Sequence, residues 1–408
     1  EDIMKKFNKF LSVAVASAMV MAMAGCGNTD NGSAATGTNA ATESAAASDS
    51  AASGSVFKIG GIGPTTGGAA VYGLAVQHGA EIAVEEINAA GGINGYQVEF
   101  KFQDDEADAE KSVNAYNALK DWGAQVLDGS TTSGACIAVT DKTKEDNMFQ
   151  ITPSGSAVEC VQYDNNFRVC FSNPNQGLAS AQYIGENGLA EKIAVIYDSS
   201  DVYSSGIYEK FAKEAENQPF EIVAAEAFTA DNKTDFSVQL QKAKDAGADM
   251  VFLPIYYQES ALILTQAAAM GYAPKWFSCD GMDGILGGVD NFDVSLTEGV
   301  MLLTPFAADA TDDLTQSFVT KYKEKYGETP NQFAADSYDA IYVIKAAIEK
   351  SGVTPDMSVS DICDGMKAAM TEITVDGLTG NGMTWTADGE ANKAPKAVVI
   401  ENGAYKAM

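Results

Sequence analysis

The sequence has few of the residues from which active sites and metal sites are most often built. Its 408 residues include one histidine, His78, which falls in the middle of a predicted helix, where a solvated side chain is expected. A single histidine excludes His-rich metal sites and argues against a Ser-His-Asp triad. The six cysteines form no CxxC pair and have no regular spacing, so neither a metal site nor a redox motif is expected. We find no nucleophile paired with a base, and we therefore expect a protein that is not an enzyme and uses no cofactor or metal.

Positive charge is also scarce. Lysine and arginine together number 26 against 56 aspartates and glutamates, which gives a formal net charge of −30. An acidic surface of this kind argues against a nucleic-acid partner and against binding to anionic lipid head groups. It does not define the charge of a ligand, because local groups decide that.

Two patterns imitate cofactor sites. Gly61, Gly63 and Gly67 follow a predicted strand, but their spacing is GxGxxxG rather than GxGxxG and Pro64 interrupts it, so we reject a dinucleotide fingerprint. The acidic segment 104–108 lacks the glycine and the terminal glutamate of a calcium-binding loop. We interpret it as a solvated connection between a strand and a helix.

The one extended apolar run lies near the start of the chain. Residues 1–25 predict a signal peptide, in which three lysines precede an apolar stretch at 11–23. That stretch is too short to span the roughly 30 Å hydrocarbon core as a helix. Residues 23–26, Met-Ala-Gly-Cys, resemble the lipobox of bacterial lipoproteins, in which the cysteine is acylated and becomes the new N-terminus. The resemblance implies that Cys26 carries a lipid, and an ordinary signal peptide is the alternative.

Residues 26–55 predict a lipidated cysteine followed by a disordered tether. After Cys26 they are almost all Ala, Ser, Thr, Gly, Asn and Asp, with no aromatic or branched aliphatic side chain. Such a segment cannot bury enough apolar surface to offset its ordering entropy, and a coil of this length reaches roughly 30 Å. We expect a globular head on the extracytoplasmic face of the cell membrane, which it contacts through the N-terminal lipid alone. The long tether favours a Gram-positive surface over a periplasm.

From residue 56 onward, short apolar runs alternate with helical patterns. Predicted strands at 57–62, 98–102, 193–197 and 250–253 are followed by predicted helices at 72–88, 109–122, 204–218 and 260–270. This alternation implies right-handed βαβ units and parallel sheets that are covered on both faces. Ligands in such folds lie at the carboxyl ends of the strands, in the loops that lead into helices.

Three breaks divide this alternation into two lobes. The breaks lie at 171–175, 304–305 and 379–382. We interpret them as three crossings between two lobes, whose ranges are 56–173 plus 305–378 for the first and 174–304 plus 379–408 for the second. The predicted fold class is therefore α/β, with two Rossmann-like lobes of parallel sheet joined by a three-strand hinge.

Ordered motifs along this head resemble one protein family. They include IGGIGPTTG at 59–67, INAAGGING at 87–95, ITPS at 151–154 and DFS at 235–237. In this order and spacing they are similar to the leucine/isoleucine/valine-binding family of ABC-transporter substrate-binding lipoproteins, which has the type I periplasmic-binding fold. The resemblance implies a monomeric Venus-flytrap receptor that captures an amino acid, branched-chain or related, between two closing lobes and delivers it to an ABC permease. A lipoprotein that senses a ligand and signals to a membrane receptor is the alternative, because it would use the same closure.

Two loops of small residues are candidates for the ligand site. Ser133 follows the turn 129–132 ahead of a predicted helix, and a helix N-terminus binds carboxylates without arginine or lysine. A plain N-cap is the alternative for Ser133. Further on, Ser154, Gly155 and Ser156 form a similar loop after the next strand. The resemblance implies that Ser133 and Ser156 bind the α-carboxylate and that the Gly155 carbonyl accepts from the α-ammonium.

Residues outside these loops complete the implied site. Asp280 stands where the family has an acidic residue that pairs with the ammonium, although the family residue is a glutamate, one methylene longer; a strand-end aspartate that caps a helix is the alternative. Three aromatic positions of the family are matched by Tyr72, Tyr203 and Tyr256. Each would supply a flat apolar wall or a cation–π face, whereas core packing would explain any one of them alone. Thr131 and Thr132 match the side-chain pocket, which their hydroxyls make more polar than a purely branched-chain specificity requires.

The cysteines after Cys26 leave disulfide pairing open. They are Cys136, Cys160, Cys170, Cys279 and Cys363. An exported protein permits a disulfide, and Cys160 and Cys170 are the nearest pair in the sequence. The spacing selects no pairing, and an odd number of cysteines leaves at least one free thiol.

Overall fold

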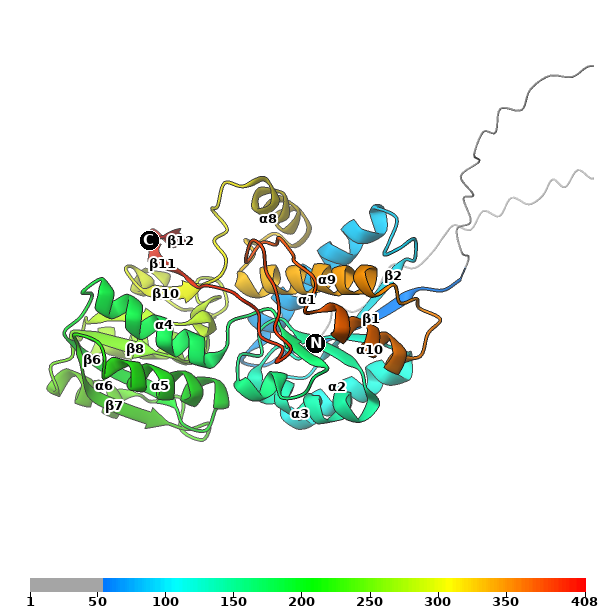
Figure 1. Cartoon of the computed structure of the whole chain (residues 1–408). Helices are drawn as coiled ribbons and strands as arrows, with labels where there is room; N and C mark the ends of the chain where they lie inside the picture. The colour runs from blue at the N-terminus through cyan, green and yellow to red at the C-terminus, as the bar shows by residue number, and fades with distance from the viewer. Residues whose placement is uncertain (1–53) are drawn as a thin grey trace, which may run out of the picture. The chain divides into compact units, whose positions relative to one another are not determined.

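The computed structural model of the chain describes residues 54–408 (Figure 1). The predicted signal peptide, the predicted lipidation site Cys26 and nearly all of the predicted tether lie outside these residues. Within residues 54–408, no helix is both long enough and apolar enough to cross a membrane.

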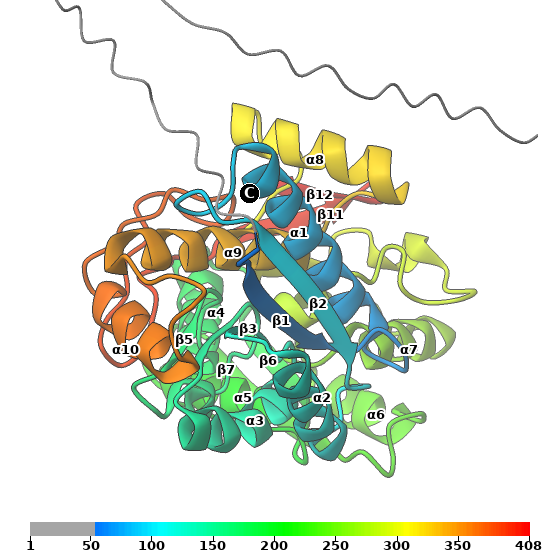
Figure 2. The ribbon, with the colours of Figure 1, turned by 90° about the vertical axis from the view of Figure 1, so that its right-hand side faces the viewer.

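The first lobe is built on a five-stranded sheet in the order β2-β1-β3-β4-β5, in which every pairing is parallel. Its strands are β1 (Phe57–Gly63), β2 (Val98–Asp104), β3 (Val126–Asp128), β4 (Phe149–Thr152) and β5 (Asn166–Arg168). Its helices are α1 (Ala70–Ala89), α2 (Ala109–Trp122), α3 (Ser133–Asp146), α8 (Asp313–Tyr326), α9 (Gln332–Ser351) and α10 (Val359–Ala369). Figure 2 shows β1 and β2 between α1 and α9 on one face and α2 and α3 on the other.

The second lobe is built on a seven-stranded sheet in the order β12-β11-β10-β9-β8-β6-β7. Its strands are β6 (Lys192–Asp198), β7 (Glu221–Phe228), β8 (Met250–Leu253), β9 (Lys275–Ser278), β10 (Met301–Thr304), β11 (Lys396–Glu401) and β12 (Ala404–Ala407). Its helices are α4 (Asn173–Glu186), α5 (Val202–Ala215), α6 (Ser237–Asp245) and α7 (Tyr257–Ala269). The strands β6 to β10 are parallel, whereas β11 and β12 add an antiparallel edge.

Alternation along β6 explains why helices cover both faces of the second sheet. Ile193 and Val195 are buried in a cluster with residues of α4 and α5, whereas Ala194 and Ile196 are buried in the larger cluster that contains α6 and α7. Successive strand residues point to opposite faces, so a strand that is apolar at every position needs cover on both. The α/β fold with two lobes of largely parallel sheet, predicted from the alternation, is confirmed.

The chain passes between the two sheets three times, and the third passage lies later than expected. The segment after residue 378 was predicted to belong to the second lobe, but its first part still contacts the first lobe. The Trp385 indole N–H donates to the Arg168 carbonyl at 2.8 Å, and the Lys393 ammonium pairs with Asp336 at 2.7 Å. Trp385, Lys393 and Asp336 are all nearly fully buried. The passage therefore lies between Lys393 and the start of β11, because burial of the indole and of this ion pair holds the preceding residues on the first lobe.

Candidate functional site

A small cavity is lined by ten residues drawn from both lobes. The lining residues are Tyr72, Thr131, Thr132, Ser133, Ser154, Tyr203, Tyr256, Asp280, Gly281 and Phe333. Most of them stand in the loops that follow β3, β4, β8 and β9, or in the first turns of the helices that these loops enter. The carboxyl ends of parallel strands thus meet here, as the alternation predicted.

Eight of the ten predicted ligand residues line this cavity, and two do not. The exceptions are Gly155 and Ser156, which lie behind it. The sequence interpretation missed Gly281 and Phe333. Phe333 lies in the first turn of α9, which begins at Gln332. The signal was present in Asn331, whose side chain accepts from the Ala334 amide and caps the helix.

The N-terminus of α3 faces the cavity with polar groups available. Thr132, not Ser133, holds the N-cap position, and no side chain caps the helix there. The Thr132 hydroxyl is buried without a hydrogen-bond partner among residues 54–408. The Ser133 hydroxyl oxygen accepts from the backbone amides of Ser156 and Ala157, each at 3.1 Å. Unpaired amides and the helix dipole make this end attractive to an anion such as a carboxylate.

The loop after β4 is held by the protein itself. The Ser154 hydroxyl donates to the Thr131 carbonyl at 2.5 Å, and the Ser156 hydroxyl donates to the Asn173 side chain at 2.7 Å. The Gly155 carbonyl accepts from the Arg168 guanidinium at 3.1 Å. These bonds engage the Ser156 hydroxyl and the Gly155 carbonyl, the two groups that the resemblance implied would contact a ligand directly. Their place in the structure is to shape the loop whose amides hold Ser133.

Asp280 is the one carboxylate that lines the cavity. One of its oxygens accepts from the Tyr203 hydroxyl at 2.6 Å, and the other accepts from the Gln176 amide at 3.0 Å. Burial raises the pKa of Asp280 to about 7; the two hydrogen bonds oppose this rise, and the nearby carboxylate of Asp336 adds to it. A cation placed beside Asp280 would lower its pKa again, because the charged form would then be stabilised.

Aromatic rings form the rest of the cavity wall. The Tyr203 and Tyr256 rings stack with their centroids 5.0 Å apart, and the Tyr72 ring meets Tyr256 edge-on with a centroid separation of 5.4 Å. The centroid of the Phe333 ring lies 4.4 Å from that of Tyr72. The hydroxyls of Tyr72 and Tyr203 already bond to protein groups, since Tyr72 donates to the Gly281 carbonyl and Tyr203 donates to Asp280. Tyr72 and Tyr203 therefore offer flat apolar faces rather than free hydroxyls.

Hydrogen bonds between the lobes surround the cavity. In addition to the bond from Tyr72 to Gly281, the Gln332 amide at the start of α9 donates to Asp283 at 2.9 Å. The Gln332 side chain donates to the Asp280 carbonyl at 3.0 Å. The cavity enclosed by these contacts measures about 20 Å³, room for about one water molecule. A larger ligand can enter only if these contacts break and the lobes separate.

The remaining cysteines and the single histidine lie outside the cavity. All five cysteines of residues 54–408 are buried free thiols, so the bond between Cys160 and Cys170 that the sequence left open is not formed. His78 is not the solvated side chain that we expected: its ring is partly buried and stacks on Tyr326 at 3.7 Å. Burial lowers the pKa of His78, which keeps the imidazole neutral near pH 7.

The acidic segment after β2 organises a turn. The Asp104 carboxylate accepts from the backbone amides of Thr65 and Thr66 and from the Thr66 hydroxyl. No group of three or more His, Cys, Asp or Glu side chains suited to a metal ion is found within residues 54–408.

Comparison with known proteins identifies the family. A model described as periplasmic binding protein matches residues 56–404. The chain is 30% identical to the Leu/Ile/Val-binding protein homolog 3 of Brucella melitensis over 73% of this chain and 80% of that protein. It is also 30% identical to the leucine-, isoleucine-, valine-, threonine- and alanine-binding protein of Pseudomonas aeruginosa, over 72% and 78% of the two chains.

Solved structures agree with this assignment. The branched-chain amino acid transporter substrate binding protein LivJ from Streptococcus pneumoniae, in complex with isoleucine, superposes with a TM-score of 0.78 at 29% identity, covering 86% of this chain and 98% of that one. The leucine binding protein LivK from Thermotoga maritima gives a TM-score of 0.76 at 27% identity with the same coverage. The chain has two lobes with a cavity between them, and the family model matches it over residues 56–404. It therefore belongs to the periplasmic binding protein family, and its relatives include Leu/Ile/Val-binding proteins.

Proposed function

We propose that this protein is the extracytoplasmic substrate-binding protein of an ABC transporter and that its ligand is a zwitterionic amino acid, branched-chain or related. One observation supports the proposal most strongly: a single cavity contains both the N-terminus of α3 and the carboxylate of Asp280. The first group favours a carboxylate and the second favours an ammonium. An α-amino acid carries both groups on one carbon, and the aromatic rings between them would contact its side chain.

Binding and closure are coupled in this proposal. The open protein would take the amino acid at Ser133 and the α3 N-terminus on the first lobe. Asp280 and Tyr203 on the second lobe would then contact the ligand only when the lobes approach, so the ligand favours the closed state by differential contact. The closed form is what ABC permease subunits would recognise, while the chemistry of ATP hydrolysis belongs to other subunits.

The route to the cell surface is also part of the proposal. The lipobox-like residues 23–26 support acylation at Cys26, which would anchor the protein to the membrane by lipid. Metabolic labelling with a palmitate analogue should mark the wild-type protein but not a Cys26→Ser variant. Labelling of neither protein would argue for an ordinary signal peptide, and equal labelling of both would contradict acylation at Cys26.

A thermal-shift panel tests the ligand class. The purified protein is unfolded and refolded to remove carried-over ligand, then heated with each of the twenty amino acids and with amine-free analogues of them. A ligand at about 100 times its Kd adds about 2.7 kcal/mol to the unfolding free energy, which raises Tm by several degrees. We expect a few amino acids to stabilise the protein and their amine-free analogues not to. Stabilisation by the amine-free acids alone, or by no amino acid, would contradict the proposal.

A further inference from the structure

Arg168 is the single arginine of the chain and one of its most deeply buried residues. It ends β5, next to the strand that leads into the Ser154–Ala157 loop. Burying a guanidinium is costly unless its N–H donors find acceptors and its charge finds a partner. The contacts of the Arg168 side chain therefore indicate its role.

The guanidinium holds the loop behind the cavity. Its two terminal nitrogens donate to the Gly155 carbonyl at 3.1 Å and to the Ala157 carbonyl at 2.9 Å. Its remaining nitrogen, Nε, lies 3.3 Å from the Glu390 carboxylate, which supplies the opposite charge. The planar fork of arginine directs donors from two separate nitrogens along fixed directions, whereas all three donors of a lysine leave one freely rotating ammonium.

One peptide group connects Arg168 to the cavity. The Gly155 carbonyl that accepts from Arg168 belongs to the same peptide group as the Ser156 N–H that donates to the Ser133 hydroxyl. A positive charge on the carbonyl side polarises the group and strengthens the bond on the N–H side. Arg168 thus acts on Ser133 through a peptide group and does not line the cavity itself.

The hydrogen bonds of Ser133 then fix the direction of its proton. A serine hydroxyl has two lone pairs and one O–H. The amides of Ser156 and Ala157 occupy both acceptor positions of Ser133, so its remaining capacity is that of a donor. Within residues 54–408 no group accepts that proton, and Ser133 lines the cavity.

We propose that Arg168 is a positioning residue that presets the Ser133 hydroxyl as a hydrogen-bond donor to the carboxylate of the ligand. The inference rests on the proposed function, since it assumes an anionic group at the α3 N-terminus. It adds a selection rule: a ligand whose group at this position can only donate would find no acceptor on Ser133.

The single arginine makes a direct spectroscopic test possible. Selective labelling of arginine with ¹⁵N gives the full-length wild-type protein one guanidinium signal set. A guanidinium held by two carbonyls rotates slowly about its Nε–Cζ bond, so we expect separate resonances for the two terminal nitrogens without ligand, and a shift of both when L-isoleucine binds. One averaged resonance in the ligand-free protein, or resonances that a bound amino acid leaves unmoved, would overturn the inference.

A double-mutant cycle provides the functional test. Arg168→Lys and Ser133→Ala are each expected to weaken L-isoleucine binding about tenfold by calorimetry. Because both changes act through the Ser133 hydroxyl, the double variant should bind no more than about twofold more weakly than whichever single variant binds L-isoleucine more weakly. Losses that multiply to about a hundredfold would show that Arg168 acts independently of Ser133 and would contradict the inference.

A matched control separates positioning from general stability. Trp385→Phe removes only the indole bond to the Arg168 carbonyl and leaves the guanidinium contacts in place. It should lower Tm but leave the affinity for L-isoleucine within about twofold. If no amino acid binds even the wild-type protein, the proposed function fails, whereas the ligand-free guanidinium spectrum still decides whether Arg168 is fixed on the loop.

Discussion

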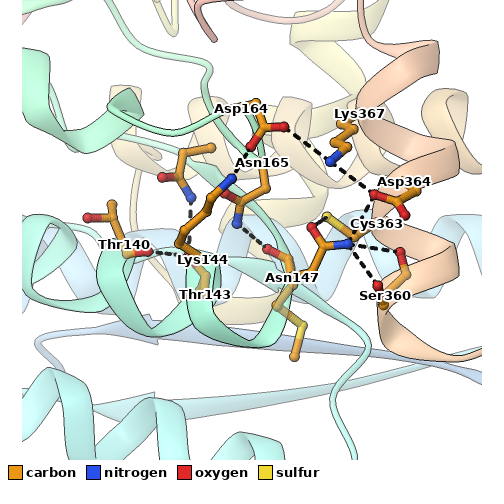
Figure 3. A network of polar contacts seen from close by, with 12 residues as sticks. Thr140, Thr143, Lys144, Asn147, Asp164, Asn165, Ser360, Cys363, Asp364 and Lys367 are labelled. Atoms are coloured by element: carbon orange, nitrogen blue, oxygen red, sulfur yellow. Dashed lines mark hydrogen bonds and ion pairs between the residues drawn. The ribbon is translucent and has the colours of Figure 1, made fainter.

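The two ends of α3 differ in how the charged groups around them are paired. Its first turn faces the cavity opposite Asp280, whose carboxylate accepts only from the neutral donors Tyr203 and Gln176. Its last turn belongs to a network on the far side of the first lobe, where Lys144 and Lys367 both pair with Asp164 (Figure 3). The first turn therefore shares a cavity with a carboxylate that has no cationic partner among residues 54–408, whereas the last turn lies among paired charges.

Asparagine 147 connects the paired end to α10. Its amide donates to the Ser360 hydroxyl at 2.8 Å and to the Asp364 carboxylate at 3.0 Å, and Lys367 pairs with the same carboxylate at 2.9 Å (Figure 3). The pKa of Asp164 is lowered, mainly by Lys144, and that of Asp364 is lowered by its bonds to Asn147 and Lys367. These bonds link helices and satisfy each charge locally.

The difference shows that Asp280, unlike Asp164 and Asp364, has no cationic partner within residues 54–408 and could still pair with a cation. A carboxylate whose pKa is lowered by its partners stabilises the fold above its ordinary pKa, and that stability is lost only when the pH falls below about 4. Asp280 behaves in the opposite way: because burial raises its pKa to about 7, ionising it costs folding free energy as the pH rises from about 4 to 7. A ligand ammonium would recover that cost on binding.

The largest expected effect comes from removing the carboxylate of the cavity. Asp280→Ala should weaken L-isoleucine binding ~30-fold or more, because truncating one partner of a buried, hydrogen-bonded charge pair costs ~2 kcal/mol or more. Asp280→Asn is the matched control, since it keeps the shape and removes only the charge, and it should lose most of the same affinity. Unchanged affinity in both variants by calorimetry would remove Asp280 from the ligand site.

The pH dependence of binding should follow from the same group. Below pH 7 the free protein increasingly carries a protonated Asp280, so the affinity for L-isoleucine should fall by up to about tenfold per pH unit between pH 7 and 5. Above pH 8 the affinity should be constant until the ligand ammonium titrates. The Asp280→Asn variant should show a flat profile over this range, and an equally flat wild-type profile would contradict the assignment.

A smaller effect is expected from the bond that joins the lobes beside the cavity. Tyr72→Phe keeps the aromatic wall but removes the hydroxyl that donates to the Gly281 carbonyl. Losing one such bond costs about 1 kcal/mol, so L-isoleucine should bind about fivefold more weakly. Stopped-flow measurements should place the change in a faster dissociation rate, because the bond exists only when the lobes are together. A change confined to the association rate would argue against a role in closure.

The smallest effect on binding should come from the paired end of α3. Asn147→Ala removes the bonds to α10 and places alanine at a positive φ of 46°, so the unfolding free energy should fall by about 1–2 kcal/mol. Asn147→Gly, which tolerates that φ, separates the backbone cost from the lost bonds. Affinity for L-isoleucine should stay within about twofold in both variants. A large loss of affinity would show that the two ends of the helix are coupled.

The sequence predicted the cavity better than it predicted the loop behind it. Residues at the carboxyl ends of strands, such as Ser133, Tyr256 and Asp280, could be placed because strand-to-helix turns show clearly in the apolar pattern. The orientation of Gly155 and Ser156 could not, because it depends on Arg168 in the following strand. No periodicity reports which carbonyl a buried guanidinium selects.

The return of the chain to the second lobe was the other part that the pattern misplaced. Residues 379–382 contain two glycines, which mark a turn, and we interpreted the turn as the crossing. The crossing follows later because Trp385 and Lys393 are held by buried partners on β5 and α9. Pairings between residues this far apart in the chain leave no local signal.

Calorimetry with one matched pair of ligands tests the central claim most directly. The amino acid that stabilises the protein most strongly in the thermal-shift panel is titrated at pH 7.5, followed by the 2-oxo acid of the same side chain, which lacks the ammonium. The account predicts that the amino acid binds at least ~30 times more tightly than the 2-oxo acid, and that Asp280→Asn removes most of this preference. Equal binding of the two ligands by the wild-type protein would contradict the claim that Asp280 is kept for an ammonium.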